Sequence, residues 1–189
     1  EFIKNISNSE GIIFVYSKYI KSGILPLALA LEYNGYQKYD GSLISDKVKS
    51  LGKYIILSGS EVLSPKNTYK NYLNIQKQNM NGEKVKIIIG TETAAEGLDF
   101  SYIRQVHILE PWFHLNKIEQ IIGRGIRNCS HIDLPIEKRT VAIFMYVAVK
   151  SEEPKRDFET LDLELYRKAE LKSRQMGYVE YLINFVKDN

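Results

Sequence analysis

Residues 85–91 read VKIIIGT, an apolar run of mostly β-branched residues that stops at a glycine and a threonine. A short run of this kind, bounded by turn residues, is typical of a strand that is buried on both faces of a parallel sheet. The same pattern occurs in GIIFVYS at 11–17 and in YIILSGS at 54–60. The chain is therefore predicted to build its core from parallel strands that end in small polar residues.

The segments between these runs indicate how the strands are connected. Helices are expected at 24–33, 64–78 and 115–127, and two further strands at 105–109 and 140–149. The polar stretch 36–53 contains two glycines and is expected to be a loop or an insertion. Strands alternating with helices predict an α/β fold, in which a mainly parallel sheet carries helices on both faces.

The pattern changes after Pro154. Val179, Leu182, Ile183 and Val186 are spaced as one face of a helix. The chain is therefore predicted to consist of an α/β domain over residues 1–150 and a helical extension over residues 151–189.

Composition places the chain among ordinary globular proteins. The hydrophobic share is 44%, the charged share is 26%, and the net charge is +3. No apolar run has the length of a membrane span, which is about 18 residues or more, and no membrane partner is expected. The single cysteine, Cys129, excludes an intrachain disulfide, favours a reducing compartment and predicts a cytoplasmic location. No cluster of His and Cys has metal-ligand spacing, so no metal site is expected.

The strand ends carry the first candidate ligand contacts. Ser17 and Lys18, Ser58 and Gly59, and Thr91 each follow a predicted strand. Ligands of doubly wound sheets bind at the carboxyl ends of the strands, where small residues let a phosphate approach the backbone. Each pair taken alone is also an ordinary turn sequence.

A stronger signal lies in the predicted helix QIIGRGIR at 120–127. Gln120, Gly123, Arg124 and Arg127 are spaced 0, 3, 4 and 7, which places them on one helical face. Two guanidinium groups on one face predict an anionic ligand, because guanidinium binds phosphate through two parallel hydrogen bonds. A glycine inside a helix costs about 1 kcal/mol relative to alanine, so Gly123 indicates a close approach by another group.

Several segments resemble a known family. TETAAEGLDF at 91–100 is similar to helicase motif V, QIIGRGIR to motif VI (Q-x-x-G-R-x-x-R) of superfamily 2, and GIIFVYSK to motif IV. The stretch from Arg104 to Val141 resembles the poxvirus-type nucleoside triphosphatase I and related helicases of large cytoplasmic DNA viruses. The resemblance implies a RecA-like fold and the C-terminal half of an ATP-dependent nucleic-acid helicase or translocase.

The resemblance also implies roles for individual residues. Arg124 and Arg127 would act on the γ-phosphate of ATP, and Gln120 would orient them. Gly97, Asp99 and Gly123 would lie near the nucleotide, with Asp99 placed to interact with the ribose or with an arginine of motif VI. Ser17, Lys18, Ser58, Gly59 and Thr91 would face nucleic-acid phosphates. Glu96 stands where motif V often has arginine, so a nucleic-acid contact from position 96 is not expected.

The same resemblance implies partners. ATP and Mg²⁺ would be held mainly by a first RecA-like domain, because these 189 residues contain neither a G-x-x-x-x-G-K-[ST] loop nor a DExH-type motif. DNA or RNA, that first domain and viral transcription machinery are the expected partners, and a viral factory or virion is the expected location. Both guanidinium groups should point together into an open cleft where a partner domain can present a nucleotide, rather than be splayed apart or capped by acidic side chains far from the strand ends.

Two other functions compete with the motor. A non-catalytic RecA-like scaffold that binds proteins would keep the fold, but it would have no use for two arginines on one helical face. A small-molecule α/β enzyme would need a nucleophile–base pair or a G-x-G-x-x-G loop, and the sequence shows neither. Among single residues, His107 and Cys129 are expected to be buried in the core, and Trp112 is expected to pack on the following helix rather than stack on a base.

Overall fold

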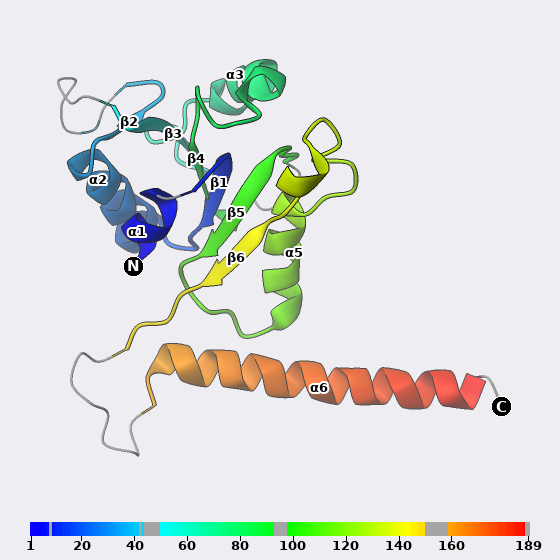
Figure 1. The fold of residues 1–189 in the computed structure, drawn as a ribbon. Coiled ribbons are helices and arrows are strands. Elements are labelled where there is room, and N and C mark those ends of the chain that lie inside the picture. The colour runs from blue at the N-terminus through cyan, green and yellow to red at the C-terminus, as the bar shows by residue number, and fades with distance from the viewer. Residues whose placement is uncertain (8, 42, 44–49, 93–97, 150–158, 188–189) are drawn as a thin grey trace.

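The computed structural model describes residues 1–187 except 8, 42, 44–49, 93–97 and 150–158 (Figure 1). Its centre is one six-stranded sheet in which every pairing is parallel. The strand order is β2-β3-β4-β1-β5-β6. The strands are β1 (Ile12–Tyr16), β2 (Tyr36–Lys38), β3 (Gly52–Leu57), β4 (Ile87–Gly90), β5 (Ile103–Ile108) and β6 (Ala142–Met145).

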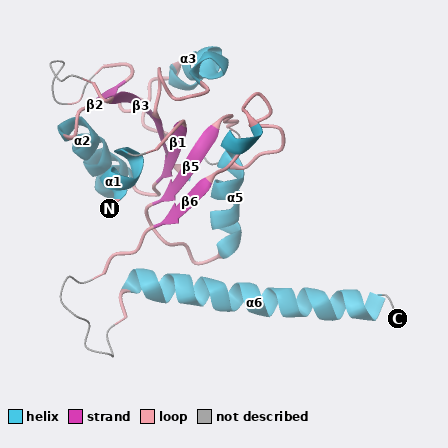
Figure 2. Ribbon diagram, viewed as in Figure 1, coloured by secondary structure: helices cyan, strands magenta, loops and turns pink. Residues whose placement is uncertain are grey.

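Helices cover both faces of the sheet, as Figure 2 shows. The α-helices are α1 (Phe2–Ser7), α2 (Leu25–Tyr33), α3 (Thr68–Ile75), α5 (Leu115–Gly125) and α6 (Leu161–Lys187). A π-helical turn (Ile20–Ile24) precedes α2, and short 3₁₀ helices span Gln76–Asn79 and Ile136–Lys138. This arrangement confirms the predicted α/β fold.

Two apolar clusters, one on each face, hold these layers together. Side chains of a strand alternate between faces, so Ile13 and Val15 of β1 meet α1 and α2, whereas Phe14 and Tyr16 meet α3 and α5. All four of these side chains are at most 1% exposed. Strand β1 is therefore buried on both sides, as its unbroken apolar sequence predicted.

Two boundaries differ from the sequence-based prediction. The stretch 36–53 was expected to be a loop, but it contains β2 and the start of β3. Strand β2 escapes detection because it is only three residues long and contains Lys38, whose ammonium is neutralised by Asp40 at 2.8 Å. The strand expected at 140–149 is only the four residues of β6, at the edge of the sheet, where Ile143 and Met145 are 41% and 53% exposed.

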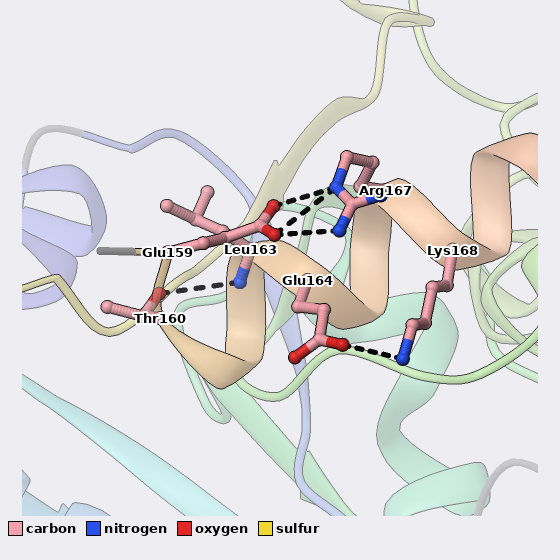
Figure 3. Close-up of polar contacts among 6 residues, drawn as sticks. All are labelled: Glu159, Thr160, Leu163, Glu164, Arg167 and Lys168. Carbon is pink, nitrogen blue, oxygen red and sulfur yellow. Dashed lines mark hydrogen bonds and ion pairs between the residues drawn. The ribbon is translucent and has the colours of Figure 1, made fainter. Parts of the chain in front are cut away.

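Helix α6 confirms that a helical segment follows the sheet, and its start is fixed by local polar contacts (Figure 3). The hydroxyl of Thr160 accepts a hydrogen bond from the backbone N–H of Leu163 at 3.4 Å, an N-cap arrangement. Glu159 forms a forked ion pair with Arg167. Beyond Ala169, which is fully buried, most of α6 is exposed and runs clear of the sheet.

No helix in the described part of the chain is long and apolar enough to cross a membrane.

His107 lies inside β5 with no exposed surface, as predicted for a core histidine. Its Nε2 lies 2.9 Å from the side-chain amide oxygen of Gln105 and its Nδ1 lies 2.9 Å from the Tyr146 hydroxyl, so a neutral ring with the proton on Nε2 satisfies both contacts. Phe144 stacks on the ring and Phe2 meets its edge. Burial lowers the pKa of His107 from 6.5 to about 4.

This depressed pKa makes the fold sensitive to acid. The unfolded chain takes up the proton more readily, so the stability that His107 confers is complete above pH 6.5 and is lost as the pH falls through about 4. Between about pH 7.5 and about pH 5, His107 should account for a loss of about 2 kcal/mol in the free energy of unfolding. Over the same pH interval, the free energy of unfolding of His107→Gln, measured by chemical denaturation, should therefore fall by about 2 kcal/mol less than that of wild type. His114→Gln, on an exposed loop, should behave as wild type, and an unchanged pH dependence in His107→Gln would contradict the assignment.

Candidate nucleotide and nucleic-acid sites

Three of the predicted strand-end residues lie side by side at the carboxyl edge of the sheet. The backbone N–H of Ser17 donates a hydrogen bond to the Gly90 carbonyl oxygen at 3.1 Å. The backbone N–H of Thr91 donates to the Leu57 carbonyl oxygen, also at 3.1 Å. Strands β3, β4 and β1 are neighbours, so their ends form one continuous edge. The contact of these positions with nucleic-acid phosphates stays a prediction.

The side chains at this edge differ in what they offer a ligand. The Thr91 hydroxyl is buried without a hydrogen-bond partner among the described residues, and Ser58 accepts only a local bond from the Ser60 N–H at 3.3 Å. Lys18 and Gly59 are exposed. Ser17, in contrast, has no exposed surface, and its hydroxyl donates to Glu110 at 2.7 Å. Ser17 therefore does not present a free donor to a phosphate in this structure.

The two arginines lie at the other end of α5. Helix α5 follows β5 and runs back along it, so Arg124 is in its last turn and Arg127 lies two residues beyond it. An Arg124 guanidinium nitrogen donates to the Leu98 carbonyl oxygen at 3.4 Å, and Arg127 pairs with Asp99. Both guanidinium groups thus converge on the segment that precedes β5. The predicted proximity of motifs V and VI is confirmed for these residues, whereas Gly97 lies outside the described residues.

The location of the arginines corrects one expectation. They were expected near the carboxyl ends of the strands rather than capped by acidic side chains far from them, but they lie beside the start of β5. There Arg127 pairs with Asp99, a contact that the resemblance also implied. The cause is the direction of α5, which runs back along β5. The turn that follows α5 is joined to the start of β5 by the hydrogen bond from the Tyr102 N–H to the Ser130 carbonyl oxygen at 3.0 Å. The Arg127–Asp99 pair is open, with side chains 49% and 67% exposed. An exposed pair contributes about 0–1 kcal/mol, so a phosphate can displace it.

The glycines of this helix have different surroundings. Gly123 is exposed, and a Cβ there would meet nothing within 4 Å, so the close approach inferred from the sequence does not come from the described residues. Gly125 is buried, and a Cβ there would lie 2.5 Å from a Val106 methyl. The close packing within the described chain is thus made by Gly125, whereas the approach of another group at Gly123 stays a prediction. Gln120 is exposed on the same helix, where its role as an orienting residue stays a prediction.

Tyr69 is a contributor that sequence reasoning missed. Its hydroxyl accepts a bond from the Asp99 N–H at 2.9 Å and lies 3.3 Å from the Asp99 carbonyl, so α3 holds the residue that pairs with Arg127. Burial raises the pKa of Tyr69, and the nearby charge of Arg127 opposes this. No motif marks position 69, because the contact joins residues 30 apart.

Cys129 departs from its predicted environment. It is exposed, with a φ of 61°, where a buried position was expected. It follows α5 in a turn rather than in the core. Trp112, in contrast, is partly buried and packs against the cluster that includes Ile118 of α5, in agreement with the packing interpretation.

The chemistry of the arginine cluster fits a nucleotide phosphate. Arg124 Nε is buried and has no hydrogen-bond partner among the described residues, and Arg127 is half-exposed. Guanidinium donors that are unused or loosely paired are suited to phosphate oxygens. The described residues contain no group of three or more His, Cys, Asp or Glu able to hold a metal ion.

Comparison with solved structures supports the fold. The C-terminal part of the Fun30 ATPase domain superposes with a TM-score of 0.55 at 14% sequence identity, and the match covers 84% of this chain and 39% of that one. At this identity the likeness concerns the fold alone, and it identifies the sheet as RecA-like.

Comparison with known sequences identifies the family. The model of the helicase conserved C-terminal domain matches residues 3–129. A putative ATP-dependent RNA helicase of Acanthamoeba polyphaga mimivirus is 33% identical over 79% of this chain. A homologue of termination factor NPH-I from African swine fever virus is 31% identical, again over 79% of this chain. The chain spans about a quarter of the length of these two relatives, 25% in each case. It belongs to the helicase conserved C-terminal domain family, with relatives among the helicases of large DNA viruses.

Proposed function

We propose that this chain is the second RecA-like domain of an ATP-dependent nucleic-acid motor of superfamily 2. In this role it supplies an arginine finger to a nucleotide held by a first RecA-like domain. At the carboxyl edge of its sheet, it also contacts the sugar–phosphate backbone of the nucleic acid. ATP is the substrate, and Mg²⁺ is bound with it by the first domain.

The observation that carries the proposal is the convergence of Arg124 and Arg127. Both guanidinium groups turn toward the Leu98–Asp99 segment, one with a buried nitrogen that has no partner among the described residues and the other in an open ion pair. A protein scaffold gains little from a buried guanidinium nitrogen without a partner, because an unsatisfied buried donor costs about 1–3 kcal/mol. A site that receives a phosphate gains the missing acceptor.

The two arginines have different tasks in this proposal. Arg127 is half-exposed and can leave Asp99 for the transferred phosphoryl group, where an arginine finger accelerates hydrolysis by about three to five orders of magnitude. Arg124 is more buried and is held at the Leu98 carbonyl, so it fixes the local charge beside the finger. Asp99, released from Arg127, is then free to accept hydrogen bonds from the ribose.

Nucleic acid is assigned to the opposite end of α5. Lys18, Ser58, Gly59 and Thr91 line the carboxyl edge of the sheet, where backbone phosphates are read without regard to sequence. ATP draws the two domains together, and hydrolysis removes the charge that joins them, so the cleft opens again. In each cycle, the contacts of one domain with the nucleic-acid strand then move along it relative to the contacts of the other domain.

The relatives suggest where this motor operates. One of them is named as a homologue of a termination factor and others as putative ATP-dependent RNA helicases. We place this chain in a viral transcription apparatus, in the cytoplasmic factory or the virion. Purification of the full motor with the viral RNA polymerase from infected cells would support this placement, whereas exclusive association with replication proteins would contradict it.

Arg127→Ala tests the finger directly. In a protein that also carries the phosphate-binding domain, kcat for ATP should fall by about three orders of magnitude while KM changes little, because the contact is made mainly in the transition state. The matched control is Arg174→Ala, an exposed arginine of α6 paired with Glu170 at 2.7 Å. ATPase activity near the wild-type value in Arg127→Ala would remove the finger from the mechanism.

The two glycines of α5 provide a second test. Gly123→Ala should raise the free energy of unfolding by about 0.5–1 kcal/mol, because its methyl group meets nothing and alanine favours the helix. Gly125→Ala should lower it by about 1–3 kcal/mol through the clash with Val106. In the two-domain motor, Gly123→Ala should nevertheless reduce ATPase activity, since the partner domain approaches there. A stabilised variant with full activity would show that nothing docks at Gly123.

The isolated chain should not turn over ATP. It lacks a phosphate-binding loop, so adding ATP and Mg²⁺ to residues 1–189 should release no phosphate above the background of buffer. A coupled phosphate assay measures this. Saturable turnover that disappears in Arg127→Ala would mean that the chain forms a complete active site.

A further inference from the structure

Glu110 joins the ends of two neighbouring strands. It follows β5, and its carboxylate accepts hydrogen bonds from the Ser17 hydroxyl at 2.7 Å and from the backbone N–H of Lys18 at 3.1 Å. Burial raises the pKa of Glu110, and the two hydrogen bonds oppose that rise. The carboxylate thus fixes the turn that follows β1, at one side of the surface assigned to nucleic acid.

The π-helical turn makes room for this contact. Gly23 lies in that turn, and a Cβ there would be 2.0 Å from the Ser17 hydroxyl oxygen and 2.9 Å from Glu110 Oε1. Turns of this type are rare and are frequent at functional sites. The backbone at Gly23 therefore closes over the Ser17–Glu110 hydrogen bond, which only a residue without a side chain permits.

The fixed turn determines the position of Lys18. Its ammonium lies 4.3 Å from the centre of the Trp112 ring, two residues beyond Glu110, and 5.5 Å from that of Tyr19. Tyr19 and Phe113 are 49% and 53% exposed. We call Lys18, Tyr19, Trp112 and Phe113 the lysine–aromatic patch. It combines a cation with exposed rings, the chemistry that proteins use to bind single-stranded nucleic acid.

We propose that Glu110 is a positioning residue for the nucleic-acid strand: it holds the Ser17–Lys18 turn so that the Lys18 ammonium rests on Trp112 and meets a backbone phosphate. This inference rests on the proposed function and deepens it. In this proposal the Ser17 hydroxyl bonds to Glu110 and does not contact the nucleic acid, whereas the Lys18 ammonium contacts a backbone phosphate. Glu110 itself does not touch the strand.

The sign of the effect separates positioning from simple charge. Removing a carboxylate from a phosphate-binding surface should strengthen binding if charge alone matters, because repulsion of the phosphate is relieved. Removing a positioning residue should weaken binding, because Lys18 loses its fixed place. Glu110→Ala therefore has opposite expected outcomes under the two explanations.

The first experiment monitors the patch without any ligand. Trp112 is the only tryptophan in the chain, so its fluorescence emission and its quenching by iodide report the position of Lys18. Glu110→Ala and Lys18→Ala should change both signals in the same way, and the double variant should add nothing further. Glu110→Gln should keep the wild-type signal, because its amide oxygen still accepts one of the two hydrogen bonds.

A glycine variant separates position from charge in the same measurement. Gly23→Ala pushes the π-helical turn away from Ser17 and Glu110 without changing any charge, and it should reproduce the Glu110→Ala signal. Gly177→Ala is the matched control, because a Cβ there meets nothing within 4 Å. Denaturation curves identify any variant that has lost its fold. If Glu110→Ala and Gly23→Ala are folded and leave the Trp112 signal unchanged, the positioning role is wrong.

The second experiment measures binding of a single-stranded oligothymidylate to residues 1–189 as a function of salt. Glu110→Ala should bind several-fold more weakly than wild type, and the slope of log K against log salt should fall by about 0.7, the value for one lost phosphate contact on a single strand. Tighter binding by Glu110→Ala would overturn the proposal in favour of simple repulsion. If wild type itself shows no salt-dependent binding, the nucleic-acid assignment of this edge fails, even where the fluorescence result upholds the link between Glu110 and Lys18.

Discussion

The contact between Gly125 and β5 is the constraint on which the candidate nucleotide site depends. The end of α5 lies directly on the sheet because position 125 has no side chain, and a Cβ there would lie 2.5 Å from Val106 and 3.1 Å from Ile103. Protein interiors are packed too densely to absorb such an overlap without movement. A larger residue would lift the end of the helix, and with it Arg124 and Arg127, away from the segment around Asp99. The positions of the two arginines thus depend on a packing contact made by Gly125, which has no side chain to bind a ligand.

The same helix separates two surfaces that the sequence suggested would coincide. Lys117, near the start of α5, pairs with Glu92 at 2.7 Å, just beyond the carboxyl end of β4. Arg127, after its end, pairs with Asp99 just before β5. Glu92 and Asp99 therefore lie beside opposite ends of α5, one at the edge assigned to nucleic acid and the other at the cluster assigned to ATP.

Much of the fold could be predicted from the sequence, because its strands are continuous apolar runs with glycine or serine at their ends. Burial on both faces makes β1 and β4 unmistakable, whereas β2 is hidden by its length and by Lys38. The candidate site was predicted only where motifs carry it. The grouping of Arg124, Arg127 and Asp99 follows from the family resemblance, but the roles of Glu110 and Tyr69 arise from contacts between distant residues. Their partners lie 93 and 30 residues away, and no local pattern records such distances.

Helix α5 has a mechanical consequence. Its eleven residues make a rod about 16 Å long, which is far stiffer than the loops at its ends. With one end seated on β5 and the other beside Glu92, the rod has little freedom to bend between its attachments. Because such a rod resists bending, a displacement of one of its ends should move the other end with it.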